Sequence, residues 1–178
     1  MRKDFNHHDS PFFKCAIPMT VDPLPYKGFS QFLRKKFTKG QRKIDDETLK
    51  KVFEMANNIS GDIQQLCEAL WEVTSEKELI GMDKLKSALK LIFSREQKSY
   101  ENYISLLTDI QLKCLMAIAM EGGKKVFSVS FMKSAGFNNP STVKRAITRL
   151  IKLNILFESE DEYRFTNPFF RAWLPHKG

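Results

Sequence analysis

The feature that most restricts the fold of this sequence is a helical hydrophobic period that begins at Gly28 and runs to Leu107. Apolar side chains recur there every three or four residues, which places them on one face of each helix and predicts that this face is buried. Four such stripes with short connections predict a small helical bundle. The stripes are Phe29, Phe32, Leu33 and Phe37; Leu49, Val52, Phe53 and Ala56; Ile63, Leu66, Cys67, Leu70 and Trp71; and Met82, Leu85, Leu89, Ile92 and Phe93.

Residues that start and end helices agree with these stripes. Asp45 is placed to cap the second helix and Ser60 to cap the third, since both side chains can accept a hydrogen bond from a first-turn amide. Gly40 and Gly81 fall between stripes. Residues 100–107 continue the fourth stripe, which predicts a long or bent helix leading into the rest of the chain.

A second set of helix signals begins at Thr108. Thr108 and Gln111 have the spacing of a capping box, so a helix starts there. Ser128 starts a short helix, and Asn139-Pro140 supplies a cap and a first-turn proline to a longer one. The buried face expected for that longer helix is Val143, Ala146, Ile147, Leu150 and Ile151.

The period then becomes that of strands. Two short apolar runs, 155–157 and 163–165, flank the acidic turn 159–162 and predict a β-hairpin. Pro168 begins a final helical turn that buries two phenylalanines and Trp173. Three helices, a hairpin and a closing turn predict a winged helix, so the expected fold class is mainly α: a helical bundle followed by a winged-helix domain with a small β-hairpin.

The segment 1–25 lacks this regularity. It contains four of the seven prolines, Pro11, Pro18, Pro23 and Pro25, and each removes a backbone donor and disfavours helix in the residue before it. We expect a connector there, with at most a short extended piece. The predicted division is therefore 1–25 as connector, 26–107 as helical bundle and 108–178 as winged helix.

Composition excludes several classes of protein. Of the 178 residues 42% are hydrophobic and 28% charged, which is ordinary for a globular protein. The three cysteines, Cys15, Cys67 and Cys114, are too far apart in sequence for a zinc or redox motif. The chain offers neither a membrane-spanning apolar run nor a signal-peptide pattern, so we expect no membrane partner and a cytoplasmic location with reduced thiols.

The sequence predicts no catalytic residues, no metal site and no cofactor for this chain. Gly122-Gly123-Lys124-Lys125 resembles part of a phosphate-binding loop, but the upstream glycine and the Ser or Thr that binds Mg²⁺ are missing. His7 and His8 beside Asp9 lack a further ligand within reach by spacing. The chain by itself is therefore not expected to be an enzyme.

Two basic surfaces are candidate binding sites. The outer face of the helix from Pro140 carries Lys144, Arg145, Thr148, Arg149 and Lys152 without an acid. Residues 108–178 carry 11 basic and 6 acidic residues, which favours a nucleic-acid partner, whereas the acidic hairpin turn opposes one. The alternative that this helix face is only exposed to solvent and binds no ligand is equally open.

The second basic surface lies in the bundle. Between Pro23 and Ile44 there are seven cations and no acid, which suits an acidic partner, nucleotide phosphates or DNA, or only a solvated face. These cations are Lys27, Arg34, Lys35, Lys36, Lys39, Arg42 and Lys43.

The order of several short motifs resembles a known family. Ser10-Pro11-Phe12-Phe13, Ile17-Pro18-Met19, Pro23-Leu24-Pro25 and the segment from Asn57 to Trp71 are similar to the post-sensor segment and helical lid of prokaryotic and archaeal AAA+ ATPases of the signal-transduction type. The winged-helix motifs that follow are similar to the domain after that lid. These are Leu107-Thr108 to Gln111-Leu112, Ala117-Ile118-Ala119 to Gly123, Phe127-Ser128, Pro140-Ser141-Thr142-Val143, and Thr166-Asn167-Pro168-Phe169-Phe170 to Leu174.

The resemblance implies a partner core and a nucleotide. An ATPase core with the P-loop would precede Met1, and ATP and Mg²⁺ would belong to that parent protein. The family often has a Gly-x-Pro turn near the adenine, where this chain has Asn58, Ile59 and Ser60, so these are the candidate nucleotide-proximal lid residues. No arginine begins the helix that follows them, although other AAA+ proteins carry a phosphate-sensing arginine there.

We therefore expect a C-terminal lid and winged-helix module that couples the nucleotide state of an ATPase to recognition of double-stranded DNA or of a protein partner. Two alternatives stay open at this stage. One is a free-standing winged-helix transcription regulator, which the presence or absence of an in-frame P-loop upstream would distinguish. The other is a protein-interaction module, which the acidic hairpin favours.

Overall fold

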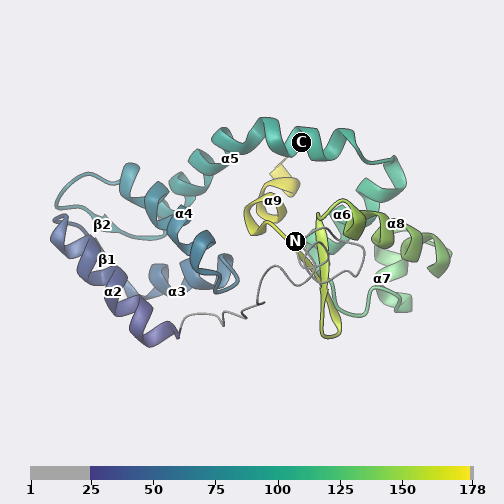
Figure 1. Cartoon of the computed structure of the whole chain (residues 1–178), viewed down its shortest axis with the longest axis horizontal. Coiled ribbons are helices and arrows are strands. Elements are labelled where there is room, and N and C mark those ends of the chain that lie inside the picture. The colour runs from purple at the N-terminus through teal and green to yellow at the C-terminus, as the bar shows by residue number, and fades with distance from the viewer. Residues whose placement is uncertain (1–24, 177–178) are drawn as a thin grey trace, which may run out of the picture.

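The computed structural model describes residues 25–176, and these are predominantly helical. A helical bundle and a winged helix are joined by the long helix α5 (Met82–Ser105), which runs along the top of Figure 1. The expected fold class is confirmed. The predicted connector and its short extended piece lie outside the described residues, apart from Pro25. Within residues 25–176 no helix combines the length and the apolarity needed to cross a bilayer.

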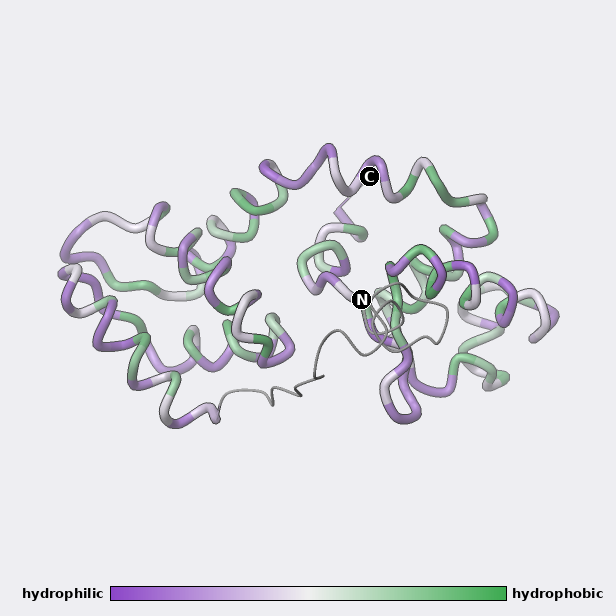
Figure 2. Tube along the Cα trace, viewed as in Figure 1, coloured by the Kyte–Doolittle hydropathy of each residue, from purple (hydrophilic) through white to green (hydrophobic). Residues whose placement is uncertain are grey.

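The bundle contains α2 (Tyr26–Lys39), α3 (Asp46–Met55), α4 (Ser60–Glu72) and the first half of α5. Two short strands that the sequence did not predict, β1 (Lys43–Ile44) and β2 (Leu79–Ile80), pair in parallel, Lys43 with Leu79 and Ile44 with Ile80. This pair ties the chain after α2 to the chain before α5. Figure 2 shows hydrophobic positions alternating with hydrophilic ones along each helix, as the predicted stripes require.

Two members of the predicted stripes are exposed. Phe32 is 49% exposed and Trp71 is 41% exposed, whereas Leu33, Phe37, Leu66 and Leu70 beside them are buried. The buried faces of α2 and α4 are therefore narrower than their apolar stripes, because a groove lies between these two helices. The apolar surface left over borders a groove that is described below.

Of the two caps predicted in the bundle, the one at Asp45 is confirmed and the one at Ser60 is wrong. The Asp45 carboxylate accepts a hydrogen bond from the Thr48 amide at 2.6 Å, so Asp45 caps α3 as expected. Ser60 does not cap α4, because the cap position is Ile59 and Ser60 already lies in the first turn. The turn before it contains Asn57 and Asn58 with positive φ angles of 50° and 58°, a left-handed conformation that asparagine adopts more readily than most residues.

Replacing Asp45 by alanine is expected to lower the free energy of unfolding by about 1 kcal/mol, because the Thr48 amide loses its acceptor at the start of α3. Urea denaturation followed by circular dichroism measures the change. Asp45→Asn, which keeps an acceptor oxygen, serves as control and should lose less. Equal losses in both variants would show that the charge of Asp45 matters more than its hydrogen bond.

The winged helix contains α6 (Asp109–Glu121), α7 (Val129–Ser134), α8 (Pro140–Lys152), β3 (Leu156–Ser159), β4 (Glu162–Phe165), α9 (Pro168–Trp173) and the 3-10 turn η1 (Leu174–His176). The predicted caps at Thr108 and Asn139 are confirmed, including the full capping box between Thr108 and Gln111. Ser128, where a short helix was expected to start, caps α7. Asn167 caps α9 in the same way, since its side-chain oxygen accepts from the Phe169 and Phe170 amides.

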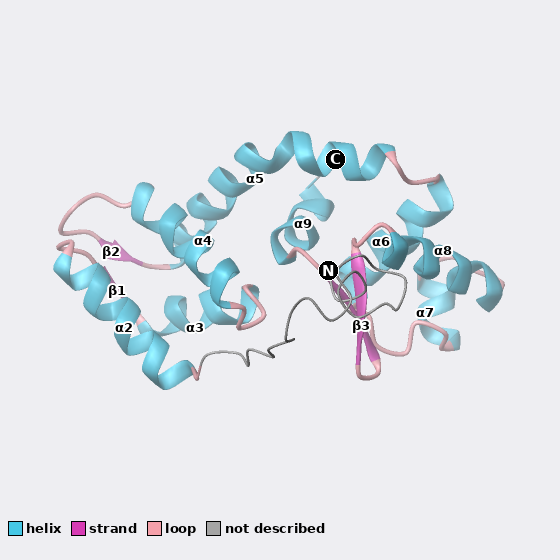
Figure 3. Ribbon diagram, in the orientation of Figure 1, coloured by secondary structure: helices cyan, strands magenta, loops and turns pink. Residues whose placement is uncertain are grey.

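Strands β3 and β4 form the predicted antiparallel hairpin, the wing (Figure 3). Leu156 pairs with Phe165 and Ser159 with Glu162, and Glu160 turns the tip with a φ of 54°. The segment after α6 lies beside β4, because the Tyr163 amide donates to the Gly123 carbonyl at 3.1 Å and Lys124 bridges to Glu162. This segment is therefore attached to the edge of the two-stranded wing sheet by one isolated bridge and one backbone hydrogen bond.

Helix α5 belongs to both parts of the molecule. Tyr100, in its second half, is 1% exposed and packs against Phe170 and Trp173 of α9, with ring centroids 5.1 and 5.2 Å apart. The second half of α5 therefore contributes to the winged-helix core, although it precedes the boundary expected at Leu107. That boundary, and the independence of the two parts, stay predictions.

Candidate functional site

The candidate nucleic-acid residues lie together on the solvent side of α8. Lys144, Arg145, Thr148, Arg149 and Lys152 are all exposed. Val143, Ala146, Ile147 and Leu150 are buried on the opposite side and hold α8 against the rest of the winged helix. The Asn139 side chain fixes the start of the helix by accepting from the Ser141 amide at 2.8 Å. The predicted grouping on one exposed face is confirmed, and its role in binding stays a prediction.

The four cations of this face, Lys144, Arg145, Arg149 and Lys152, are available to a ligand. Within residues 25–176 the ion pairs involve other cations, namely Arg34, Lys51, Lys84, Arg95 and Arg164. The Thr148 hydroxyl instead donates to the Lys144 carbonyl at 2.9 Å, so it is satisfied within its own helix. The face therefore offers a ligand mainly positive charge, because its one hydroxyl is already engaged.

The wing has the opposite charge. Glu158, Glu160 and Asp161 are exposed, and Glu162 holds Arg164 through a contact of 2.9 Å between a carboxylate oxygen and Nε. Burial, together with Glu158, raises the pKa of the Tyr163 hydroxyl, so Tyr163 adds no charge at neutral pH. The wing thus carries no unpaired cation among its described residues and would repel a phosphate backbone.

A cleft that the sequence did not predict lies between the start of α8 and the wing. Its volume is about 570 Å³, and Phe127, Ser141, Lys144 and Tyr163 line it. Phe127 is 43% exposed although it directly precedes the cap of α7. The sequence shows only that an aromatic residue directly precedes the cap of α7. That Phe127 is exposed and that Tyr163 lies near it are visible only in the tertiary structure.

The candidate lid residues Asn58, Ile59 and Ser60 are exposed at the α3–α4 turn. Asn58 lines a pocket of about 320 Å³ that also involves the wing and α9. Ile59 and Ser60 do not line it. The structure therefore places this turn facing the winged helix, and its contact with a nucleotide stays a prediction.

This pocket does not fit the triphosphate of ATP. Glu54 and Glu162 present carboxylates to it, and Arg164 is already paired with Glu162. Arg171, the other cation among the lining residues, donates through Nε to the Ala119 carbonyl at 3.2 Å, so a single unpaired guanidinium stands beside two carboxylates. A polyphosphate needs unengaged cations or backbone amides and would be repelled by the two acids.

The second basic cluster is not one uniform surface. Arg34 pairs with Asp46 and donates to the Ile44 carbonyl at 3.1 Å, so it holds α2 against the start of α3. Arg42 lies 4.1 Å from the Trp71 ring centroid and Lys36 lies 5.3 Å from that of Phe32. The others, Lys27, Lys35, Lys39 and Lys43, are exposed.

The cysteines and glycines that were considered for metal, redox or phosphate binding have structural roles. Burial raises the pKa of Cys67 to about 12 and that of Cys114 to about 11, so both stay protonated and unreactive at neutral pH. Gly122-Gly123-Lys124 ends α6 and lies against β4, where Lys124 bridges to Glu162. Within the described part of the chain, no three His, Cys, Asp or Glu side chains are grouped to hold a metal ion. His7, His8 and Cys15 lie outside the described residues.

Comparisons with known proteins agree with this architecture. Residues 98–176 match the model of a family described as a probable winged helix domain, so the match begins within α5, just before Tyr100. Among curated proteins no relative matches. The structure is similar to that of the Walker-type ATPase of Pyrococcus abyssi, with a TM-score of 0.64 and 15% sequence identity.

That likeness covers 96% of this chain and 47% of the Pyrococcus protein, so the chain spans about half its length. At this identity the likeness is one of fold. It agrees with the fold expected from the sequence motifs: the chain carries a winged helix, and together with the helical bundle its fold is similar to that of part of this Walker-type ATPase.

Proposed function

We propose that this chain is the lid and winged-helix module of an AAA+ ATPase and that it couples the nucleotide state of an ATPase core to recognition of double-stranded DNA. ATP and Mg²⁺ would bind the core, and this module would move with it. The observation that carries the DNA assignment is the exposed cationic face of α8, which has no ion-pair partners among the described residues.

The dimensions of that face suit a DNA groove. Lys144 and Lys152 are eight residues apart, which corresponds to about 12 Å along a helix. The major groove is about 12 Å wide, so the face can reach phosphates on both of its sides while the start of α8 lies near the bases. Arginine at 145 and 149 can in addition form paired hydrogen bonds with guanine.

The continuity of α5 supports a lever role. A single helix of 24 residues spans about 36 Å. Helix α5 packs on α4 through its first half and through Arg95, just past its middle, which pairs with Glu72. Further along, Tyr100 packs on α9. A displacement of the bundle would therefore be passed to the winged helix through one rigid element.

The DNA proposal is tested with Arg145→Glu/Arg149→Glu. Fluorescence anisotropy with a labelled duplex at low salt should show binding by the unaltered chain, and the variant should bind at least about a hundredfold more weakly because two attractions become repulsions. The plot of log affinity against log salt should lose a slope of about 0.9 for each phosphate contact removed. Circular dichroism checks that the variant is folded, since both positions are exposed.

The matched control is Lys86→Glu/Lys90→Glu, which makes the same charge change on the exposed side of α5. It should change the affinity less than about threefold, because only net charge is altered. No binding by the unaltered chain, or equal losses in both variants, would refute DNA recognition by α8.

Protein recognition is the second candidate, and the acidic wing is the observation that favours it. If DNA is the ligand, Glu160→Lys/Asp161→Lys should strengthen duplex binding by removing repulsion near the backbone. If the wing instead binds a basic protein surface, this variant leaves duplex binding unchanged.

A further inference from the structure

An apolar groove of about 550 Å³ separates α2 from α4, on the side of the bundle away from the winged helix. Its floor consists of Leu33 and Phe37 of α2 and Cys67 of α4, all buried. Lys36 and Lys39 border it on the α2 side, and Trp71 closes it on the α4 side. No role in the proposed DNA recognition involves these residues, so the inference below is independent of that proposal.

Trp71 is held in a fixed position although it is 41% exposed. Its ring lies so close to Gly40 that a Cβ there would come within 1.8 Å of the ring, which only glycine permits. Its ring centroid is 6.0 Å from that of Phe37, and the Arg42 guanidinium lies 4.1 Å from it.

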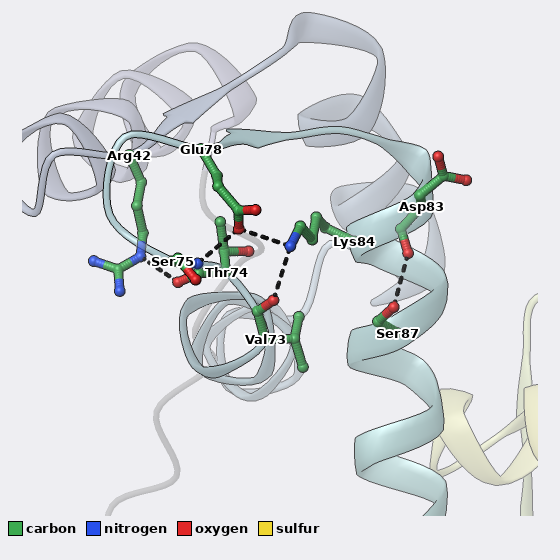
Figure 4. Close-up of polar contacts among 8 residues, drawn as sticks. All are labelled: Arg42, Val73, Thr74, Ser75, Glu78, Asp83, Lys84 and Ser87. Carbon is green, nitrogen blue, oxygen red and sulfur yellow. Dashed lines mark hydrogen bonds and ion pairs between the residues drawn. The ribbon is translucent and has the colours of Figure 1, made fainter.

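Arg42 is itself anchored by two backbone carbonyls. Its Nε donates to Thr74 and its Nη1 to Gly40, both at 2.9 Å, and Figure 4 shows the Thr74 contact. In the same loop the Glu78 carboxylate accepts from the Ser75 amide and from Lys84, which keeps the pKa of Glu78 below its usual range. A rigid, partly exposed tryptophan beside an anchored arginine is the typical composition of a binding hot spot.

We propose that this groove binds an amphipathic helix with an acidic outer face, supplied by a partner protein. A helix fits because the lining residues of α2 and α4 recur at helical spacing on both sides, so a third helix can place side chains between them. The partner's apolar residues would cover Leu33, Phe37 and the free edge of Trp71.

Charge complementarity specifies the acidic face of the partner. Residues 26–44 contain seven cations and no acid, and Lys36 and Lys39 stand directly at the rim. Nucleic acid fits less well, because the floor is apolar and Arg42 already covers one face of Trp71 on which a base would stack. Glu68, which also lines the groove, is paired with Arg95.

The test uses the full chain and a fluorescein-labelled synthetic peptide of about 18 residues, or five helical turns. The peptide carries Leu and Phe at i, i+3, i+4 and i+7 and Glu elsewhere. Anisotropy should show saturable binding, and the emission of Trp71 should shift to shorter wavelength as its edge becomes buried. The shift should vanish in Trp71→Phe, because Trp173 is already buried.

Two variants alter the groove in different ways. Lys36→Glu/Lys39→Glu reverses the rim charge and should weaken binding about tenfold or more. Gly40→Ala displaces Trp71 without changing any charge and should also weaken binding. Arg145→Glu/Arg149→Glu makes the same charge change on α8 and should leave peptide binding unaltered, whereas duplex binding should weaken at least about a hundredfold.

Several outcomes would overturn the proposal. The first is that the unaltered chain does not bind the peptide. The second is that a peptide of the same composition with scattered apolar residues binds equally well. The third is that Lys36→Glu/Lys39→Glu leaves the peptide affinity unchanged. If duplex DNA displaces the peptide from the unaltered chain, and Lys36→Glu/Lys39→Glu weakens DNA binding as well, the groove binds nucleic acid. Self-association in sedimentation velocity that Lys36→Glu/Lys39→Glu abolishes would assign it to a second copy of the chain.

Discussion

Replacing Phe170 by alanine is expected to lower the free energy of unfolding by about 3–5 kcal/mol, because it empties the centre of the aromatic cluster that joins α5 to the winged helix. Phe170 is buried, and its ring lies 5.1 Å from Tyr100, 5.4 Å from Tyr103 and 6.1 Å from Trp173 between centroids. Truncation would leave a cavity bordered by rigid rings and by β4, where collapse is difficult.

Urea denaturation followed by both circular dichroism and tryptophan emission measures this loss. Coincident transitions would indicate that bundle and winged helix unfold together, and separated transitions would indicate two cooperative units. Phe127→Ala is the matched control, because Phe127 is 43% exposed and lies outside the cluster, and it should lose less than about 1 kcal/mol. A loss below about 1.5 kcal/mol for Phe170→Ala would show that the aromatic cluster repacks and does not hold α5 against the winged helix.

Tyr100 provides a second check on the same joint. Its hydroxyl is buried without a well-oriented hydrogen-bond partner among the described residues, and burial, reinforced by Glu96, raises its pKa while the nearby Asn167 side chain partly offsets this. Tyr100→Phe keeps the ring and removes only the hydroxyl, so it should change stability by less than about 1 kcal/mol in either direction.

The elements that the sequence predicted correctly are those determined by local interactions. The capping box at Thr108 and the caps at Asp45, Ser128 and Asn139 depend on residues two or three positions apart, which a sequence displays directly. The exposed face of α8 follows from the helical period once its buried face is known. The hairpin was predicted because apolar runs flank a polar turn.

The features that were missed depend on residues distant in sequence. Strands β1 and β2 have two residues each and pair across more than 30 intervening residues, so neither shows a period of its own. Trp71 was assigned to the core because it continues the stripe of α4, whereas its position depends on Gly40 and Arg42 after α2. The cleft beside α8 and the groove beside Trp71 both require elements that only the tertiary structure brings together.

Gly123→Ala is the second substitution expected to have a large effect, with a loss of about 3 kcal/mol in the free energy of unfolding. A Cβ at Gly123 would lie 1.8 Å from the Tyr163 carbonyl oxygen and 2.7 Å from its carbon. These are backbone atoms of β4, so no side-chain rotation can relieve the overlap. Either the Tyr163-to-Gly123 hydrogen bond breaks or the wing moves away from α6.

The same experiment has a built-in comparison in Gly28→Ala. A Cβ at Gly28 meets nothing within 4 Å, and Gly28 lies in α2, where alanine is the better helix former, so this variant should gain about 0.5–1 kcal/mol. Because Glu162 and Arg164 flank Tyr163, Gly123→Ala should also broaden or shift the amide signals of the wing in nuclear magnetic resonance spectra. If Gly123→Ala is as stable as the unaltered chain and its wing signals are unchanged, the contact of the segment after α6 with β4 does not hold the wing in place. In that case the orientation of the wing relative to α8 must be fixed by β3 and α9 alone.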